Sequence, residues 1–172
     1  MQDTLPIHFA PLQGYTEAIY RNAHDAFFGG VDTYYTPFVR LEKGNFRRRD
    51  VRGIEPENNG VTHLIPQLIA SSAEKAEVIL SLFIEKGYQE VDINLGCPFP
   101  LLAKRHNGSG ILPYPEEVKA LLSIVTRYPQ ISFSVKMRLG WEQPDECLAL
   151  APILNDLPLR QITMHPRLGK QG

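Results

Sequence analysis

Short apolar runs alternate with helix-like segments along this chain, and that alternation limits the possible folds more than any other feature. The apolar runs are rich in β-branched and aromatic residues and are separated by helical patterns or long crossovers. The expected strands cover residues 7–10, 31–39, 64–69, 91–95, 133–137 and 161–164. Repeated strand and helix units form a parallel sheet with helices outside it, so we expect an α/β fold with about six βα units.

Local sequence preferences mark the expected helix ends. Ser71 and Ser72 are N-cap candidates for a periodic helix over 73–86, which Gly87 would end. The other expected helices are 17–28 with Thr16 as N-cap, 115–127 beginning at a proline, and 145–154 with an interruption or kink near Pro152.

Polar residues at the strand ends distinguish the two parallel architectures. In a (β/α)8 barrel, inward-facing residues at the carboxyl ends of the strands form the floor of the active site. A doubly wound sheet instead binds its ligand at one switch point, usually with a glycine-rich turn after the first strand, and the turn over 10–17 holds a single glycine. The polar strand-end residues are Gln67, Asn94, Lys136, Arg138, His165 and Arg167. We therefore expect a (β/α)8 TIM barrel, of which about six units are present in this chain.

The strand over 91–95 leads to the main catalytic candidate, Cys97. Asp92 and Asn94 alternate with apolar residues, so the apolar face would pack on helices while the polar face looks into the barrel. A glycine and a proline frame Cys97 in a tight loop at the strand end. A thiol with the ordinary pKa of about 8.5 can donate a proton at neutral pH, whereas a nucleophilic thiolate needs a nearby base or cation. The sequence leaves both roles open.

Charge and cysteine content exclude several classes of protein. The net charge of -1 gives no general attraction to polyanions, so nucleic-acid binding requires a local patch, such as residues 40–52 with six cations and two acids. Cys97 and Cys147 form no CxxC pair, which argues against a metal site or a disulfide framework and fits a reducing cytoplasm. No run approaches the roughly 18 apolar residues of a membrane span. We expect a cytoplasmic protein without a membrane or a metal.

Five stretches together resemble the tRNA-dihydrouridine synthases, flavin enzymes whose catalytic domain is an FMN-binding (β/α) barrel. They are FAPLQGYTEAIYR (9–21), PQLIAS (66–71), VDINLGCPFPLLAKRHNGSGIL (91–112), VKMRLGW (135–141) and ITMHPRLGKQ (162–171). INLGCP with the following GSG is highly specific, and the other stretches are weak alone. One departure is HPR at 165–167, where the family often has HGR.

The resemblance implies a reaction and a set of site residues. Reduced FMN would deliver a hydride to C6 of a uracil in tRNA, Cys97 would protonate C5, and NADPH would regenerate the flavin. The residues expected beside the flavin are Pro11, Leu12, Gln13, Gln67, Lys136 and His165. Those expected to contact the tRNA or its target base are Asn94, Arg138 and Arg167. The cationic stretch 40–52 would hold phosphates beside the pocket.

Several candidates also have alternative interpretations. Cys97 could be an inert thiol of the core. Asn94 and Gln67 could tie down loop backbone. Lys136 could be a solvated strand-end lysine or form a Schiff base, and His165 could be a structural histidine. The basic run over 47–49 could be an ordinary solvated face.

The chain length departs from a complete barrel. A (β/α)8 barrel takes about 250 residues, and this chain has 172. We therefore expect residues 1–172 to be the N-terminal portion of the catalytic barrel, without barrel strands 7 and 8 and without the C-terminal helical tRNA-binding domain. Such a piece would leave sheet edges unpaired and bind FMN poorly. Two other functions stay open: an FMN-barrel oxidoreductase of small molecules, similar to dihydroorotate or dihydropyrimidine enzymes, and a non-catalytic RNA-binding fragment.

Overall fold

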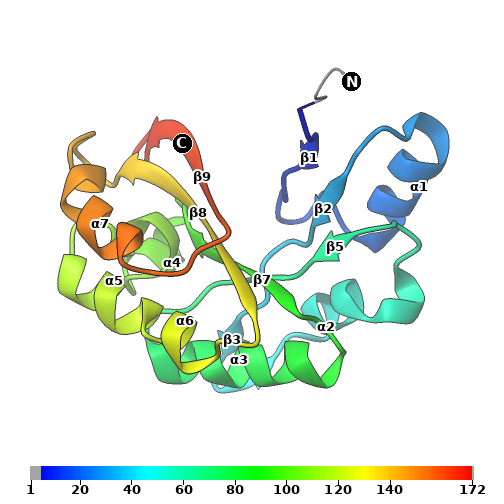
Figure 1. The fold of residues 1–172 in the computed structure, drawn as a ribbon, viewed down its shortest axis with the longest axis horizontal. Helices are drawn as coiled ribbons and strands as arrows, with labels where there is room; N and C mark the ends of the chain where they lie inside the picture. Colours follow the sequence, from blue (N-terminus) through cyan, green and yellow to red (C-terminus); the bar gives the residue numbers. More distant parts are fainter. Residues whose placement is uncertain (1–4, 172) are drawn as a thin grey trace.

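Strands and helices alternate through residues 5–171, the part of the chain that the computed structural model describes (Figure 1). The strands are β1 (His8–Phe9), β2 (Thr33–Tyr35), β3 (Leu41–Glu42), β4 (Asn45–Phe46), β5 (Leu64–Ile65), β6 (Gln67–Leu68), β7 (Glu90–Leu95), β8 (Ser132–Gly140) and β9 (Gln161–Leu168). The α-helices are α1 (Ala18–Phe28), α2 (Arg48–Ile54), α3 (Ala73–Glu85), α4 (Pro100–Ala103), α5 (Pro115–Leu122), α6 (Ile124–Arg127) and α7 (Glu146–Asn155). Short 3-10 helices are η1 (Pro56–Asn58) and η2 (Gly108–Ile111).

The strands pair in parallel and in chain order, apart from the antiparallel hairpin of β3 and β4. β1 pairs with β2 and β2 with β5, while β6 pairs with β7, β7 with β8 and β8 with β9. Pro66 separates β5 from β6. Val39 joins the two groups, because its N–H donates to the Gln67 carbonyl at 2.8 Å and its carbonyl accepts from the Ile69 N–H at 3.1 Å. The prediction of an α/β fold with parallel strands is confirmed.

The core lies between the central strands and the helices that follow them in the chain. Every residue from Val91 to Leu95 is buried, and Phe83 of α3 and Phe133 of β8 are fully buried in the same cluster. As expected, Ser72 caps α3, its hydroxyl accepting from the Lys75 N–H at 3.5 Å. The core is therefore centred on β7, which has a strand on each side.

Two predicted helix boundaries are wrong. The Thr16 hydroxyl does not cap α1 but accepts from the Leu12 N–H at 2.8 Å, which closes the turn after β1, and Glu17 takes the N-cap position without a side-chain bond. The predicted helix over 115–127 divides at Ser123 into α5 and α6. The interruption predicted near Pro152 is also wrong, because α7 continues past this proline to Asn155.

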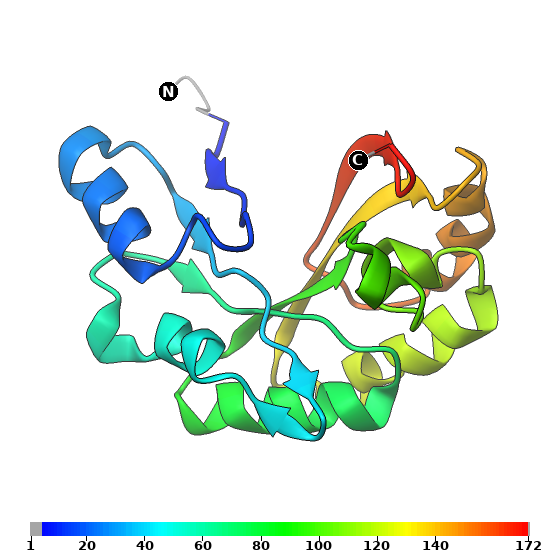
Figure 2. The same cartoon turned by 180° about the vertical axis from the view of Figure 1, so that it is seen from behind.

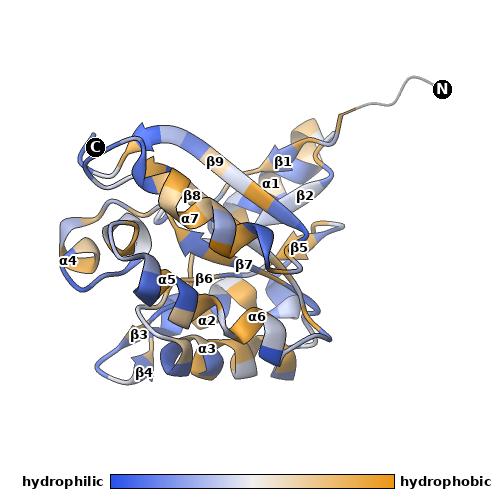
Figure 3. Ribbon diagram, turned by 60° about the vertical axis from the view of Figure 1, so that its left-hand side comes forward, coloured by the Kyte–Doolittle hydropathy of each residue, from blue (hydrophilic) through white to orange (hydrophobic). Residues whose placement is uncertain are grey.

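β1 and β9 lie at opposite ends of the parallel order, with the other parallel strands between them (Figures 1 and 2). Within the described residues, β1 pairs only with β2, and β9 only with β8. Hydrophobic and hydrophilic residues follow one another along β9 (Figure 3), and its Ile162 and Met164 are 41% and 40% exposed. None of the helices in residues 5–171 combines the length and the apolar character that crossing a membrane requires.

Candidate functional site

A cavity of about 400 Å³ opens where the carboxyl ends of the central strands meet the loop after β1. Nine of the ten predicted site residues line it, namely Pro11, Leu12, Gln13, Gln67, Asn94, Cys97, Lys136, Arg138 and His165. Arg167 is the exception: it is exposed near the end of β9 and does not line the cavity. Residues far apart in the chain therefore face one space, as expected for the carboxyl end of a parallel sheet.

Strand register explains this convergence. Neighbouring parallel strands place their polar residues opposite one another, and the side-chain period of two keeps these residues on one face of the sheet. The opposed pairs are Gln67 with Asp92, Asp92 with Ser134, Asn94 with Lys136, and Arg138 with His165. Polar side chains thus continue along one face of the sheet from its buried part to the cavity.

A buried hydrogen-bonded network begins at Asp92, which is 2% exposed. Its carboxylate accepts from the Ser134 hydroxyl at 2.5 Å and from Gln67 Nε2 at 2.6 Å. Burial raises the pKa of Asp92, against the opposing effects of these two hydrogen bonds and of the Lys136 charge. Asp92 was not among the predicted site residues, although its position two residues before Asn94 on the same strand face was a usable signal.

The same network reaches the loop that carries Cys97. Asn94 Nδ2 donates to Gln67 Oε1 at 2.7 Å, and Asn94 Oδ1 accepts from the backbone N–H groups of Gly96 and Cys97 at 3.0 and 2.8 Å. The side chain of Asn94 therefore holds loop backbone, as its structural alternative anticipated, whereas the side chain of Gln67 bonds to the side chains of Asp92 and Asn94. This network fixes the orientation of the loop.

The Cys97 thiol lies in a mainly apolar environment. Cys97 is partly buried and packs against a small cluster of Phe38, Ile69 and Leu102. Burial raises the pKa of the Cys97 thiol above its ordinary value, and the charges of Arg138 and Arg40 oppose this rise without reversing it. The thiol is therefore protonated at neutral pH, which favours proton donation over nucleophilic attack.

The GSG segment packs directly on the cysteine loop. Gly108 has φ of +59°, and a Cβ atom there would lie 2.5 Å from the Cys97 carbonyl oxygen and 2.8 Å from the Cys97 Cβ. Ser109 donates to that carbonyl from both its N–H and its hydroxyl, each at 3.0 Å. Only glycine fits at Gly108, so the cysteine motif and the GSG motif form one structural unit.

The cationic side chains of the site have different environments. Arg138 is 6% exposed and donates from Nε to the Gly96 carbonyl at 3.0 Å and from Nη1 to the Leu168 carbonyl at 2.6 Å, which ties the cysteine loop to the end of β9. The Lys136 ammonium group makes no hydrogen bond to any described residue, and burial lowers its pKa. Burial and the charges of Arg138, Lys136 and Arg167 lower the pKa of His165, so its ring is neutral at pH 7.

Gln13 presents an amide that lacks a protein partner. Both its Nε2 and its Oε1 are buried, and neither has a hydrogen-bond partner among the described residues. Buried polar groups are almost always paired, because an unpaired one costs about 1–3 kcal/mol. An amide of this kind at a cavity wall fits a ligand edge that carries both a donor and an acceptor.

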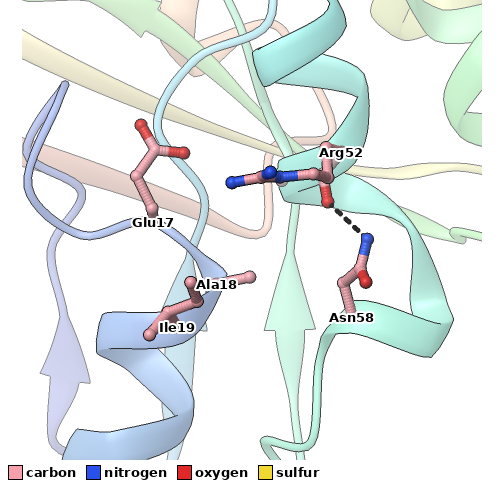
Figure 4. Close-up of a pocket in the computed structure, with 6 residues that line it drawn as sticks. Glu17, Ala18, Ile19, Arg52 and Asn58 are labelled. Carbon is pink, nitrogen blue, oxygen red and sulfur yellow. Dashed lines mark hydrogen bonds between the residues drawn. The ribbon is translucent and has the colours of Figure 1, made fainter.

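A smaller hollow, of about 250 Å³, lies between α1 and α2 and is shown in Figure 4. The side chains of Glu17 and Arg52 point toward the same space, and Asn58 Nδ2 donates to the Arg52 carbonyl at 3.1 Å. None of the predicted site residues lines this hollow. Within residues 5–171, no group of three or more His, Cys, Asp or Glu side chains is arranged to hold a metal ion.

Comparison with known proteins identifies similar sequences. Residues 8–172 match the model of a family described as Dihydrouridine synthase (Dus). The chain is 28% identical over 170 residues to "Probable tRNA-dihydrouridine synthase 1" of Synechocystis sp., which covers 95% of this chain and 46% of that protein. It is 27% identical over 176 residues to "tRNA-dihydrouridine(16) synthase" of Haemophilus ducreyi, covering 96% of this chain and 53% of that protein. It thus spans about half the length of these curated relatives.

Proposed function

Because this chain belongs to the dihydrouridine synthase family, we propose that its protein is a flavin-dependent oxidoreductase that reduces specific uridines in tRNA to 5,6-dihydrouridine. The printed names of its relatives support the substrate and the product. The observation that carries the proposal is the Cys97 thiol, kept protonated by its apolar surroundings and fixed at a polar cavity by the Asp92 network.

We further propose that residues 1–172 form the N-terminal portion of a (β/α)8 catalytic barrel. The parallel order from β1 to β9 supports about six βα units of such a barrel. Barrel strands 7 and 8 and a helical tRNA-binding domain would lie outside these residues. The single-sided pairing of β1 and β9 supports this proposal, because two further strands between them would pair both edges.

FMN is the cofactor that the cavity residues fit. The unpaired Gln13 amide suits the alternating donors and acceptors of a flavin edge, and Pro11 and Leu12 supply an apolar surface beside it. Lys136 would stabilise negative charge on the reduced ring, while neutral His165 and Gln67 would hydrogen-bond its polar atoms. When bound, reduced FMN would supply the hydride that reaches C6 of the uracil, and NADPH would restore the reduced form.

The remaining roles belong to residues of the substrate side. Cys97 would give its Sγ proton to C5 of the uracil, so that hydride and proton together saturate the C5–C6 bond. Asn94, Arg138 and Arg167 would contact the tRNA or its target base. A uracil in folded tRNA has to leave its stack to enter such a cavity, where hydrogen bonds can read its polar edge.

The test is Cys97→Ala in the whole protein, with Cys147→Ala as the matched control. We expect Cys97→Ala to keep its flavin absorbance and its reduction by NADPH while tRNA reduction falls about 10²- to 10⁴-fold, because only the proton donor is lost. Cys147 lies in α7 with its thiol donating to the Pro144 carbonyl at 3.2 Å, so its loss should leave turnover unchanged. Normal turnover in Cys97→Ala would refute the assignment.

A further inference from the structure

A further hollow, of about 350 Å³, which we call the hairpin hollow, lies on the other side of the apolar wall that supports Cys97. The wall is the cluster of Phe38, Ile69 and Leu102: Phe38 lines the cavity that holds Cys97, whereas Ile69 and Leu102 line the hairpin hollow. A ligand bound in this hollow would therefore lie next to the candidate catalytic thiol without occupying its cavity.

Cationic side chains from separate parts of the chain line the hollow. Arg40 and Lys43 come from the hairpin region, Lys75 from the first turn of α3, and Arg105 from the segment after α4. The single carboxylate in the lining, Glu42, pairs with Arg40 at 3.3 Å. Four positive charges thus face one negative charge in a chain whose net charge is -1. The lining therefore gives the hollow a positive electrostatic potential, which favours the binding of anions.

The cationic side chains of the hollow have few acceptors among the described residues. Lys43, Lys75 and Arg105 form no ion pair with any residue in 5–171, and Lys75 Nζ donates only to the Ser71 hydroxyl, at 2.9 Å. Arg40 Nε is buried and has no acceptor among the described residues. A buried N–H without an acceptor is rare, so this donor remains available to an acceptor that the described residues do not supply.

The arginines of α2 form a less suitable anion site. Arg48, Arg49 and Arg52 line a separate hollow of about 380 Å³ with Glu17, whose carboxylate has no ion-pair partner in the described part of the chain. Arg49 also lies 4.0 Å from the Asp50 carboxylate. That hollow has neither a buried unpaired donor in its lining nor contact with the Cys97 wall.

We propose that the hollow lined by Arg40, Lys43, Lys75 and Arg105 binds a backbone phosphate of the RNA beside the reactive uridine. The identity of the ligand as RNA rests on the proposed function. When a base enters the Cys97 cavity, the phosphates that flank it remain at the surface, and the hollow supplies charge and N–H donors for one of them. The proposed site takes the first two cations of the stretch over 40–52 and adds Lys75 and Arg105 from two other segments.

The test uses the double variant Lys75→Gln/Arg105→Gln, because both residues are exposed and neither contacts Cys97. The matched control Lys104→Gln/Lys119→Gln removes the same two charges from exposed positions that do not line the hollow. We expect the first variant to raise the KM for tRNA about tenfold and to reduce the slope of log Kd against log salt by about 1, because a phosphate contact is lost. Its kcat, flavin content and KM for NADPH should not change.

Three outcomes would overturn the phosphate site: an unchanged KM for tRNA, an equal rise in the control variant, or a rise in the KM for NADPH instead. Filter binding of tRNA to both variants separates this proposal from the proposed function. If the wild-type protein binds tRNA but does not reduce it, and only Lys75→Gln/Arg105→Gln weakens binding, the proposed function fails and the phosphate site stands.

Discussion

β7 and β9 have similar alternating sequences but very different surroundings. β7 pairs on both sides and buries each residue from Val91 to Leu95, whereas β9 pairs only with β8 in the described residues and leaves Ile162 and Met164 at 41% and 40% exposure. The other flank behaves like β9, since Phe27 and Phe28 of α1 are 83% and 80% exposed. An apolar pattern therefore contributes to stability only where neighbouring elements cover it.

The residues of the candidate site also come partly from the well-covered central strands and partly from the two exposed ends of the parallel order, here called the flanks. Cys97 and the network that orients it belong to the central strands, where the core is dense. Gln13 and His165, which are proposed to hold the flavin, come from the two flanks. The proposed proton donor is thus supported by the central strands, while the proposed flavin contacts depend on strands that pair with only one neighbour in the described residues.

The strongest test of the difference between the central strands and the flanks is to remove one aromatic ring from each region. Phe83→Ala should lower the free energy of unfolding by about 3–5 kcal/mol, because Phe83 is fully buried under the central strands. The same change at Phe27 should cost less than about 1 kcal/mol, since that ring is already in water. Urea unfolding of both variants measures the difference, and equal losses would contradict the division into centre and flanks.

A second test compares two hydrogen-bonded aspartates. Asp92→Ala should cost about 1–3 kcal/mol of unfolding free energy at pH 7, because Gln67 and Ser134 would lose their buried acceptor. Asp32 accepts from the Ile7 N–H at 2.6 Å on the exposed β1 flank, so Asp32→Ala should cost about 0.5 kcal/mol. Thermal unfolding of the pair checks the order, and a larger loss at Asp32 would reverse the interpretation.

On the flank, Gln13→Ala should affect the proposed cofactor rather than the fold. The amide has no protein partner to lose and its burial without a partner costs about 1–3 kcal/mol, so the flavin-free protein should lose no free energy of unfolding and should gain up to that amount. The Kd for FMN, measured by flavin fluorescence quenching, should rise about tenfold as a hydrogen-bonded pair is lost. A destabilised variant with normal FMN affinity would show that Gln13 has a structural role instead.

The smallest expected effect concerns the pH at which the rate of tRNA reduction begins to fall, which the Cys97 thiol should shift upward. A proton donor works only while protonated, and burial raises the pKa of Cys97, so tRNA reduction should stay constant through neutral pH and fall only above the ordinary thiol pKa of about 8.5. Single-turnover rates across pH 6–10 would locate this limb. A decline that begins near pH 7 would indicate a thiolate and contradict the donor role.

Local signals in the sequence predicted much of the fold. The helix over 73–86 and the strand over 91–95 were found because their caps, periodicity and turn residues all act within a few positions. Thr16 misled because a threonine hydroxyl can close a turn as readily as it caps a helix. The break at Ser123 had no comparable local signal.

Contacts between distant segments were the harder part. Nine of the ten predicted site residues line the cavity. Asp92 and Ser134 were not predicted, because their pairing is set by the register of β7 and β8 rather than by either segment alone. The basic stretch over 40–52 was interpreted as one patch, but the hairpin of β3 and β4 directs its first cations to one hollow and the arginines of α2 to another. The sequence specifies which residue types are present, whereas the register of the strands and the geometry of the turns determine which of them come into contact.

The run from Leu64 to Leu68 pairs with two different strands, and this double pairing restricts insertions and deletions of residues within the run. Leu64 and Ile65 pair with β2, while Gln67 and Leu68 pair with β7 beyond Pro66. A single codon inserted here would turn Gln67 toward the helices and Leu68 toward the cavity, since side chains alternate at every residue. Insertion scanning should therefore find this pentapeptide intolerant, while codons inserted in the Lys43–Gly44 turn should leave the fold intact and affect only the proposed phosphate site, which both residues line.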